Sequence, residues 1–340
     1  MIQKKRILFL TRLYHPHIGG VEKHVEELSS VFIKKGYEIT IITEKFNKKL
    51  PGSDVIKGCK VYRIDIPGNA FLKKFFIWKW MVLHVNIIAQ SDILHIHDVF
   101  YWYIPFRFLF LFKKTYITFH GYEGFPIKRT WKMQRKLAEV LTNGNICVGE
   151  FMKKWYKTRP TSVIYGGVRL EGKKYMSKAR TGVFFGRLDG QTGILDYIKA
   201  YNLVKRKYPD FVMTVVGEGK LKVRIPKGVN VIGFRKDIYP YIQKNRLIFV
   251  SRYLSMLEAL ASKREVIATY DNAVKRDYLL LSPFKKYIHV GSSASEIADI
   301  VITLLGRKTP SKELYMGAKW AQTQTWDKVA TTYLSLWNTK

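Results

Sequence analysis

The sequence predicts an α/β protein made of two similar, doubly wound domains, each built on a parallel sheet. Its 340 residues are enough for about two domains of roughly 150 residues each. Short apolar runs that end in polar, glycine-containing turns and lead into amphipathic helices recur along the chain. This order restarts near the middle of the chain, which predicts a domain boundary near residue 165.

The first domain is expected to begin with a βαβ unit. Residues 5–11 and 37–43 are short apolar runs of the kind found in buried parallel strands. Between them, apolar residues recur at helical spacing, and Gly36 marks the end of the helix. Further strands are predicted at residues 60–67, 92–98, 115–121 and 144–150, followed by a helix from Phe151.

The second domain repeats the pattern. Its strands are predicted at residues 162–168, 180–188, 211–219, 229–234, 247–251 and 266–271, with a helix at 193–209. Trp326 and Trp337 lie in helical sequence near the end of the chain, and we expect this helix to pack back on the first domain. The predicted domains are therefore residues 1–165 and 166–322, with a C-terminal helix at 323–340.

Charge is the unusual feature of the composition. The chain has 59 Lys and Arg against 26 Asp and Glu, a net charge of +33. Such a charge favours anionic partners: nucleic acid, an acidic membrane surface or phosphorylated small molecules. A lysine-rich surface of a thermophile protein is the alternative. The excess is spread over both halves and no nucleic-acid-binding motif occurs, so a nucleic-acid-binding protein is disfavoured.

Cysteine usage and apolar runs indicate an intracellular chain. Cys59 and Cys147 are the only cysteines, too few for a disulfide framework or a zinc site. No apolar run reaches the ~20 residues that a membrane-spanning helix needs. The N-terminal apolar run is short and leads into a glycine turn rather than a small-residue cleavage site, unlike a signal peptide. A cytoplasmic location is expected.

Glycines and one arginine follow predicted strands, where doubly wound sheets bind their ligands. Gly19 and Gly20 precede a helix, and glycines there let the backbone approach a phosphate closely. The turn is not GxGxxG, so dinucleotide binding is disfavoured. Arg187 lies in a glycine-flanked loop and can pair bidentately with a diphosphate, and Gly217 marks a similar turn. A simple turn and a solvated arginine remain the alternatives.

Histidines gather at the ends of two predicted strands. His95 and His97 are expected on one face of their strand, with Asp98 on the other. His120 ends the next strand, with Glu123 nearby. A metal site is disfavoured because no further ligand set is evident, and we interpret His120 as a hydrogen-bonding group in a cleft.

One carboxylate is a candidate for nucleotide binding. Residues 251–272, SRYLSMLEALASKREVIATYDN, predict a turn, a short helix and a buried strand. Glu258 is expected near the N-terminus of that helix, where the dipole stabilises a negative charge. A carboxylate there can accept hydrogen bonds from a ribose diol, although an ordinary first-turn glutamate is the alternative.

Together these fragments resemble the family 4 glycosyltransferases of the GT-B fold. HPHIGGVEKHVEELSSVFIKKGYEITIIT, DILHIHD, ITFHG, VIYGGV, FFGRL, VVGEG, VNVIGF and LEALASKREVIATYD occur in the family order. The resemblance implies two facing Rossmann-like domains and a retaining, metal-independent transfer of a hexose-type sugar from a UDP- or GDP-linked donor. No other cofactor is implied. The donor is expected mostly on the C-terminal domain and the acceptor on the N-terminal one.

The resemblance also assigns roles to single residues. Gly19 and Gly20 match the loop near the donor diphosphate, and His120 matches the histidine that contacts the transferred sugar. Arg187 matches the arginine on the diphosphate. Glu258 matches the second glutamate of the E-x7-E motif, which binds the donor ribose. His120 and Arg187 are therefore the predicted catalytic residues, and Gly19, Gly20, Arg187, Gly217 and Glu258 the donor-binding ones.

The chain departs from the family at three points. Val250 stands where the first glutamate of E-x7-E is expected, and the glycine-rich loop before Glu258 is absent. Thr192 stands where the family has a second diphosphate cation, and Lys220 is the candidate substitute. Lys263 and Glu265 replace the usual glycine and proline. A catalytically weak or inert GT-B binding or scaffold protein is therefore an alternative to an active enzyme.

Two aromatic and basic segments predict contact with a membrane. Residues 69–90 and 99–114 are too short to span a bilayer but suit interfacial insertion beside anionic lipids. Their candidate contact residues include Lys73, Lys74, Trp78 and Trp80. Ordinary helices that cover the core are the alternative. The prediction is a peripheral enzyme on the inner face of the cell membrane, with a lipid-linked or membrane-associated glycan acceptor.

Overall fold

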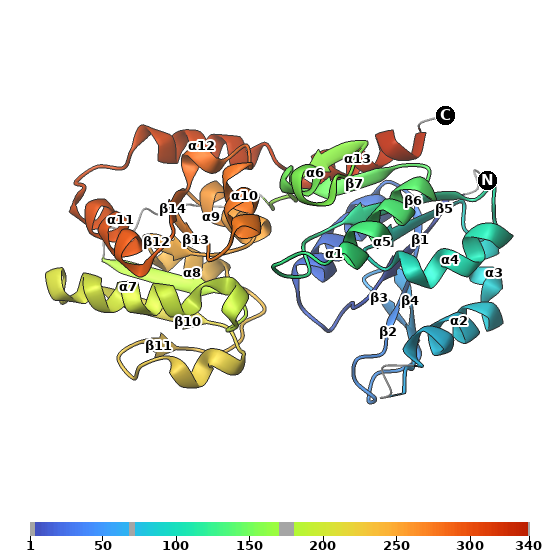
Figure 1. The fold of residues 1–340 in the computed structure, drawn as a ribbon, viewed down its shortest axis with the longest axis horizontal. Helices are drawn as coiled ribbons and strands as arrows, with labels where there is room; N and C mark the ends of the chain where they lie inside the picture. The colour runs from blue at the N-terminus through green and yellow to red at the C-terminus, as the bar shows by residue number, and fades with distance from the viewer. Residues whose placement is uncertain (1–3, 68–71, 170–179, 339–340) are drawn as a thin grey trace. The chain divides into compact units, whose positions relative to one another are not determined.

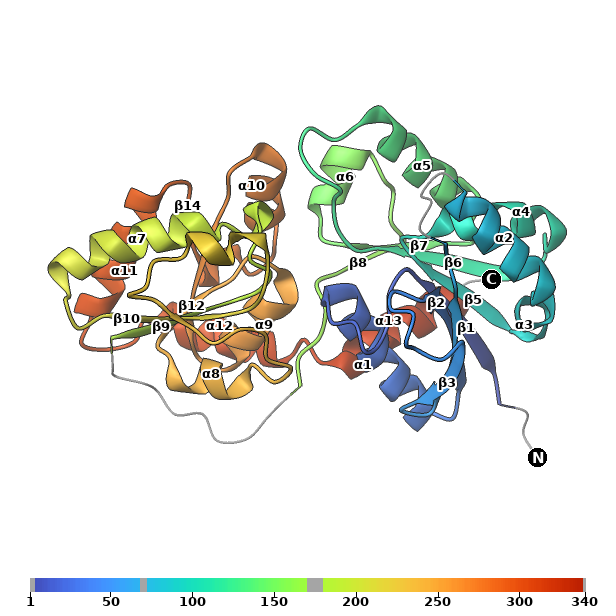
Figure 2. The same cartoon turned by 90° about the horizontal axis from the view of Figure 1, so that it is seen from below.

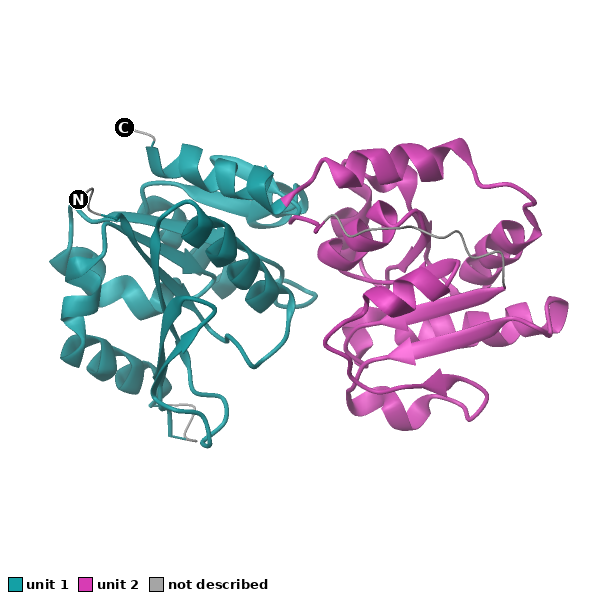
Figure 3. Cartoon of the chain, turned by 180° about the vertical axis from the view of Figure 1, so that it is seen from behind, with its two compact units in different colours: residues 1–165, 326–340 teal, residues 166–325 magenta. Residues whose placement is uncertain are grey.

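The computed structural model describes residues 4–67, 72–169 and 180–338. The chain divides into two compact units (Figure 3). Unit 1 comprises Met1–Tyr165 and Trp326–Lys340, and unit 2 comprises Gly166–Thr325. Each unit holds a parallel sheet with helices on both faces, which confirms the predicted fold class.

The sheet of unit 1 has eight strands in the order β3-β4-β2-β1-β5-β6-β7-β8. All neighbours pair in parallel except β3 and β4, which are antiparallel. The strands are β1 (Arg6–Thr11), β2 (Glu38–Glu44), β3 (Ser53–Ile56), β4 (Cys59–Ile64), β5 (Ile93–His97), β6 (Lys114–Phe119), β7 (Asn145–Val148) and β8 (Ser162–Ile164).

Helices cover both faces of this sheet (Figures 1 and 2). One face carries α1 (Gly20–Lys34) and α13 (Trp326–Asn338). The other carries α2 (Lys73–Leu83), α4 (Phe100–Leu109), α5 (Arg129–Val140) and α6 (Phe151–Tyr156), and α3 (Val85–Gln90) follows α2. The ring centroids of Phe32 on α1 and Trp337 on α13 lie 4.9 Å apart. The C-terminal helix therefore packs on the unit that begins the chain.

The sheet of unit 2 has six strands, all parallel, in the order β11-β10-β9-β12-β13-β14. The strands are β9 (Thr181–Phe185), β10 (Val212–Val216), β11 (Asn230–Val231), β12 (Leu247–Phe249), β13 (Glu265–Thr269) and β14 (His289–Gly291). Helices α7 (Ile194–Lys207) and α11 (Ala294–Gly306) pack together, as do α9 (Tyr253–Ala261) and α12 (Lys312–Gln322). Shorter elements are α8 (Tyr239–Lys244), α10 (Ala273–Leu280) and the 3₁₀ turns Gly190–Thr192, Lys220–Arg224 and Lys285–Tyr287.

One strand was predicted in the wrong series. The run at residues 162–168 was expected to open the second domain, but β8 is the eighth strand of the first sheet. It pairs in parallel with β7, where Ser162 lies opposite Ile146. Only residues 162–164 are extended, because the following glycines lead the chain out of the sheet.

Both sheets have a point at which the strand order reverses. From β1 the chain moves outward through β2, then returns to place β5 on the other side of β1. In unit 2 the chain moves from β9 to β10, then returns to place β12 on the other side of β9. Loops diverge at such switch points, and ligands of doubly wound sheets bind there. We call them the β1/β5 and the β9/β12 switch points.

Candidate functional site

At the β1/β5 switch point, three imidazoles come together. His97 is the last residue of β5, His120 follows β6 directly, and His24 projects from the first turns of α1. Nδ1 of His97 lies 2.8 Å from Nε2 of His120, a hydrogen-bond distance. The ring of His24 meets that of His120 edge to face at 4.8 Å between centroids. The predicted site residue His120 is thus held by two other histidines.

The hydrogen bond between His97 and His120 has a preferred direction. Nε2 of His97 is buried and has no hydrogen-bond partner among the described residues. An orphaned buried donor is rarer than an orphaned acceptor, so the proton of His97 belongs on Nδ1. His97 then donates to Nε2 of His120. The single N–H of a neutral His120 consequently lies on Nδ1, and this residue can act as a hydrogen-bond donor toward a ligand.

A second hydrogen-bonded chain runs behind these rings. The indole N–H of Trp337 donates to Nδ1 of His95 at 3.0 Å, so His95 carries its proton on Nε2. That Nε2 lies 2.8 Å from the hydroxyl of Thr118, which lies 2.8 Å from the hydroxyl of Tyr333. Tyr333 in turn lies 2.9 Å from Nε2 of His24. The C-terminal helix therefore fixes the histidines of the β1/β5 switch point.

Burial keeps these imidazoles neutral. Removal from water lowers the pKa of His24, His95 and His97 well below the ordinary value, and the neighbouring histidines add to the effect. Burial also lowers the pKa of His120 to about 3, helped by His95 and Arg135. Near neutral pH His120 is thus a neutral group for hydrogen bonding, not a cation for a phosphate.

Asp98 lies beside His120. It directly follows β5 and has a backbone φ of 63°. Its Oδ1 accepts a hydrogen bond from the backbone N–H of His120 at 3.0 Å. Asp98 is an exposed residue, but the loss of hydration around its carboxyl group raises its pKa to about 6. Arg135 and this hydrogen bond oppose the rise. Asp98 thus positions the backbone at the end of β6.

The predicted phosphate-binding glycines begin α1. Gly19 is the N-cap residue in extended backbone and Gly20 is the first helical residue. A side chain on Gly19 would meet the carboxylate of Glu22, whereas no atom lies within 4 Å of the position of a Cβ on Gly20. Glu22 is also bonded to His17, with 2.8 Å between Oε1 and Nδ1. A ligand would therefore approach this helix start over Gly20.

At the β9/β12 switch point, two glycine loops interlock. A Cβ on Gly217 would come 1.9 Å from the carbonyl oxygen of Gly186, and one on Gly219 would come 2.4 Å from that of Leu188. The N–H of Leu188 donates to the carbonyl of Glu218 at 2.9 Å. Only glycine permits this approach, which brings the predicted residues Arg187, Gly217 and Lys220 onto adjoining loops.

Arg187 is exposed at this edge. Its side chain is 69% exposed and its Nε lies 3.3 Å from a carboxylate oxygen of Asp189. Thr192 is buried and donates its hydroxyl proton to the carbonyl of Asp189, so it offers no charge. Lys220 is exposed at the start of a 3₁₀ turn on the neighbouring loop. Arg187 can pair with an anion without first being desolvated.

Arg252 is a residue of this edge that the sequence did not reveal. It is the N-cap residue of α9, three positions after the end of β12, and its guanidinium donates to the side-chain oxygen of Gln191 at 3.2 Å. Gln191 in turn donates its backbone N–H to Asp189. Arg187 and Arg252 thus contact the same loop from the two strands that flank the switch point. Arg252 is a second cation where Thr192 supplies none.

The position of Glu258 differs from the prediction. Helix α9 begins at Tyr253, so Glu258 is the sixth of its nine residues and not part of the first turn. The macrodipole acts within the first turn and cannot account for a carboxylate there. Glu258 is half-buried on α9, and its ribose-binding role rests on the family resemblance alone.

Buried side chains donate hydrogen bonds to the backbone carbonyls of the loop before α9. Val250 is fully buried, and its carbonyl accepts the hydroxyl of Tyr197 at 3.3 Å. The ammonium of Lys275, buried on α10, donates to the carbonyl of Ser251. Burial and the positive charge of Arg252 lower the pKa of Lys275 well below its usual range. Val250 therefore offers its carbonyl to the core and no carboxylate to a sugar.

The four predicted membrane residues lie on α2, and the start of that predicted segment, residues 69–71, lies outside the described residues. Lys73 pairs with Glu44 at 2.7 Å, and the ammonium of Lys74 lies 5.8 Å from the ring centroid of Tyr101. The indole N–H of Trp78 donates to the carbonyl of Tyr101, while the ring of Trp80 stacks on His84 at 3.9 Å. Both tryptophans are half-buried.

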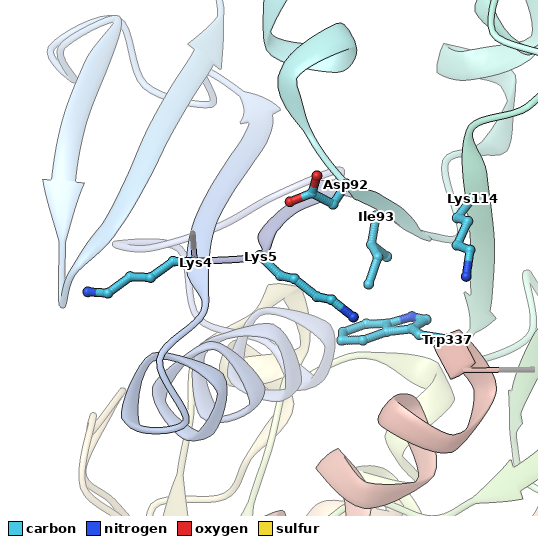
Figure 4. Close-up of a pocket in the computed structure, with 6 residues that line it drawn as sticks. All are labelled: Lys4, Lys5, Asp92, Ile93, Lys114 and Trp337. Carbon is cyan, nitrogen blue, oxygen red and sulfur yellow. The ribbon is translucent and has the colours of Figure 1, made fainter. Parts of the chain in front are cut away.

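A separate pocket of about 280 Å³ lies in unit 1 (Figure 4). Lys4, Lys5 and Asp92 precede β1 or β5, and Lys114 begins β6, so the pocket lies at the edge where these strands start. The indole of Trp337 forms one side. None of the predicted site residues lines it, and the switch points lie at the other ends of the strands.

The described residues contain neither a membrane-spanning helix nor a cluster of metal ligands. Within residues 4–67, 72–169 and 180–338, no helix has the length and apolarity required to cross a bilayer. Over the same ranges, no three histidine, cysteine, aspartate or glutamate side chains gather closely enough to hold a metal ion.

Two protein-family models match successive parts of the chain. Residues 18–171 match glycosyltransferase family 4, and residues 179–307 match glycosyl transferases group 1. Among curated proteins, a subunit of human phosphatidylinositol N-acetylglucosaminyltransferase is 24% identical over 242 residues. That match covers 64% of this chain and 49% of the human protein, so the chain spans about half of it. An uncharacterized glycosyltransferase of Methanocaldococcus jannaschii is 23% identical, covering 94% of this chain and 95% of its own.

Solved structures share the fold at low identity. Sucrose-phosphate synthase from Thermosynechococcus elongatus superimposes with a TM-score of 0.78 at 14% identity, over 98% of both chains. HepE of Anabaena, in complex with UDP, gives 0.68 at 13% identity, over 97% of this chain and 98% of its own. WaaG, a glycosyltransferase involved in lipopolysaccharide biosynthesis, gives 0.66 at 13%, over 96% and 99%.

Proposed function

Because the chain belongs to the glycosyltransferases of the GT-B fold, with a family 4 region followed by a group 1 region, we propose that it transfers a hexose-type sugar from a nucleotide sugar. The observation that carries this proposal is the pair Arg187 and Arg252 at the β9/β12 switch point of unit 2. Two guanidinium groups beside close-packed backbone are suited to a diphosphate. HepE, whose crystal structure is in complex with UDP, supports a UDP-linked donor. A GDP-linked donor is the alternative.

The proposed chemistry is metal-independent and retains the configuration at the anomeric carbon. The bond from that carbon to the leaving phosphate oxygen breaks, and its electron pair stays with the phosphate. Arg187 and Arg252 stabilise the charge that develops there. The acceptor oxygen bonds to the carbon from the same face, and the leaving phosphate takes the acceptor proton. Neutral His120 donates a hydrogen bond to a sugar hydroxyl, and no protein nucleophile is required.

The proposed acceptor is a lipid-linked or membrane-associated glycan. The human relative is named for a phosphatidylinositol substrate, and WaaG for lipopolysaccharide biosynthesis, which supports an acceptor of this class. The net charge of +33 favours an anionic membrane surface. We therefore place the enzyme in the cytoplasm, peripherally bound to the inner face of the membrane.

Release of nucleotide tests the enzymatic proposal. The protein is incubated with a panel of UDP- and GDP-sugars without acceptor, and free UDP or GDP is measured. Slow release from at least one donor is expected, together with a rise in thermal midpoint on binding UDP or GDP. Binding without release from any donor would favour the inert scaffold alternative. A chain that binds no nucleotide but shifts single-stranded RNA at physiological salt would be a nucleic-acid-binding protein.

A further inference from the structure

Helix α10 bonds to the backbone on both sides of Arg252. Strands β12 and β13 are parallel neighbours, so the loop that carries Arg252 and the loop that leads into α10 leave the same edge of the sheet. The side-chain nitrogen of Lys275 donates to the carbonyl of Ser251, the residue before Arg252. The hydroxyl of Tyr278 accepts the backbone N–H of Tyr253, the residue after it, at 2.9 Å. Both peptide groups that flank Arg252 are therefore bonded to one helix.

The helix that makes these bonds is itself firmly held. The rings of Tyr253 and Tyr278 stack with their centroids 3.8 Å apart and their planes 6° from parallel, and the hydroxyl of Tyr253 donates to the carbonyl of Tyr278. The side chain of Asn272 caps α10 by accepting the backbone N–H of Lys275 at 2.9 Å. We call Lys275 and Tyr278 the α10 clamp. Because the clamp restricts the backbone of Arg252, its guanidinium can meet an anion at a smaller loss of conformational entropy.

Lys275 is a buried amine without an acidic partner. It is 2% exposed, and within the described part of the chain no carboxylate forms an ion pair with its Nζ. Burial and the positive charge of Arg252 lower the pKa of Lys275 well below its usual range, and exposed Asp271 opposes this effect. Lys275 also lies in the first turn of α10, where the helix dipole disfavours a cation. The free protein therefore favours the neutral amine at this position.

An anion bound by Arg252 would shift this balance toward the ammonium. The ring centroid of Tyr278 lies 4.5 Å from Nζ, and its face can stabilise a positive charge, as can Asp271. Tyr253, the other titratable group of the stack, is a hydrogen-bond donor and so keeps its proton. Arg252 is the group that repels a charge on Nζ, and a diphosphate paired with Arg252 would offset that repulsion.

We propose that the α10 clamp positions Arg252 for the donor diphosphate, and that Lys275 takes up a proton from solvent when the diphosphate binds. The proton adds to the lone pair of Nζ, and no bond of the donor changes in this step. The ammonium then makes a stronger hydrogen bond to the carbonyl of Ser251 than the neutral amine does. This inference rests on the proposed function and assigns two positioning residues to its donor site.

Calorimetric titration tests the inference. The full-length protein is titrated with UDP and with GDP between pH 6 and 9, in buffers of different ionisation enthalpy, so that the protons taken up on binding are counted. Lys275→Met keeps the length of the side chain and removes the amine. It should lack a proton uptake that the wild type shows, and should bind the nucleotide about fivefold more weakly. Ionisation of the nucleotide itself is common to both proteins and cancels in the difference.

Two further variants separate the clamp from charge and stability. Tyr278→Phe keeps the ring stack and removes the hydroxyl, and should weaken binding about threefold with the proton uptake retained. Arg276→Met is the matched control, because Arg276 is the next cation on α10 and its side chain is 47% exposed. It should change affinity less than about twofold and leave the proton uptake as it is. All variants are checked for an unaltered thermal midpoint.

A double-mutant cycle decides whether the clamp acts through Arg252. Lys275→Met combined with Arg252→Ala should bind no more weakly than Arg252→Ala alone, since nothing is left to position. If Lys275→Met does not fold, Tyr278→Phe replaces it in the cycle. Additive losses, or the same proton uptake in the wild type and Lys275→Met, would overturn the inference and leave nucleotide binding standing. Absence of UDP and GDP binding by the wild type would overturn the proposed function as well.

Discussion

The β1/β5 switch point of unit 1 presents neutral imidazoles that are buried and bonded to one another, whereas the β9/β12 switch point of unit 2 presents guanidinium groups. His97 and His95 are almost completely buried, while most of the Arg187 side chain is exposed to solvent. A neutral donor recognises a sugar hydroxyl without repelling or trapping an anion. An exposed cation is accessible to a diphosphate and can form a bidentate pair with it. Two sheets of similar topology thus present edges suited to chemically different ligand groups, a hydroxyl in unit 1 and an anion in unit 2.

The same contrast predicts different responses to acid. Seven of the eight histidines lie in unit 1, and His289 of unit 2 is paired with Glu265. His24, His95 and His97 have pKa values well below 6.5 in the folded protein. Below pH 6.5 the unfolded chain binds protons that the folded unit does not, so stability falls as pH falls. Once the unfolded histidines are fully protonated, the three residues together should cost about 4 kcal/mol per pH unit. His120, whose pKa is lowered to about 3, adds to this fall, and Asp98, whose pKa is raised to about 6, opposes it.

Hydrogen exchange followed by mass spectrometry between pH 7 and 4, corrected for intrinsic rates, measures this difference. Peptides of β5 and β6 should lose protection at a higher pH than peptides of β9 and β10. His95→Gln, which removes one buried titrating group, should lower the slope by about 1.4 kcal/mol per pH unit. Earlier loss of protection in unit 2 would contradict the comparison.

At the other switch point, removal of charge should have the largest effect on catalysis. Arg187→Ala should lower kcat/KM for donor hydrolysis by about 10²–10³-fold, since a cation on the leaving phosphate acts mainly in the transition state. Arg252→Ala should also lower kcat/KM, because its guanidinium contacts the same loop through Gln191. Both are measured by nucleotide release.

Lys199→Ala is the control for charge alone. Lys199 is 71% exposed on α7 and weakly paired with Asp196 at 3.9 Å. Its loss should leave kcat/KM within about twofold. Equal losses from Arg187→Ala and Lys199→Ala would mean that overall charge, and not the β9/β12 switch point, holds the diphosphate.

In unit 1, His120→Ala should lower kcat about 10- to 100-fold with less effect on donor affinity, the amount expected for one hydrogen bond in the transition state. His97→Asn keeps a donor near the position of Nδ1 and should retain most activity, whereas His97→Gln places its amide farther out and should lose about tenfold. Steady-state kinetics with donor titrations separate kcat from KM. Equal activity of the two His97 variants would argue against a hydrogen bond donated by His97 to His120.

The strands were largely predictable from sequence because buried parallel strands are continuous apolar runs. β3 and β14 were missed: SDVI has two polar and two apolar residues and is mostly exposed, and HVG is too short. Arg252 was missed because its partner Gln191 lies 61 residues away, so no local pattern marks it. The link from His24 to Tyr333 spans 309 residues for the same reason. Contacts of this kind require the fold.

The smallest expected effect concerns Glu258. Since Glu258 lies in the second half of α9, any contribution to donor binding must come from direct hydrogen bonds and not from the helix dipole. Glu258→Gln keeps the size and one acceptor oxygen, and should weaken UDP or GDP binding about threefold, while Glu258→Ala should weaken it about tenfold. Isothermal titration with the nucleotide and with inorganic diphosphate distinguishes the two partners. A ribose-binding carboxylate lowers affinity for the nucleotide only, and equal loss for diphosphate would place Glu258 in the cationic edge of the site instead.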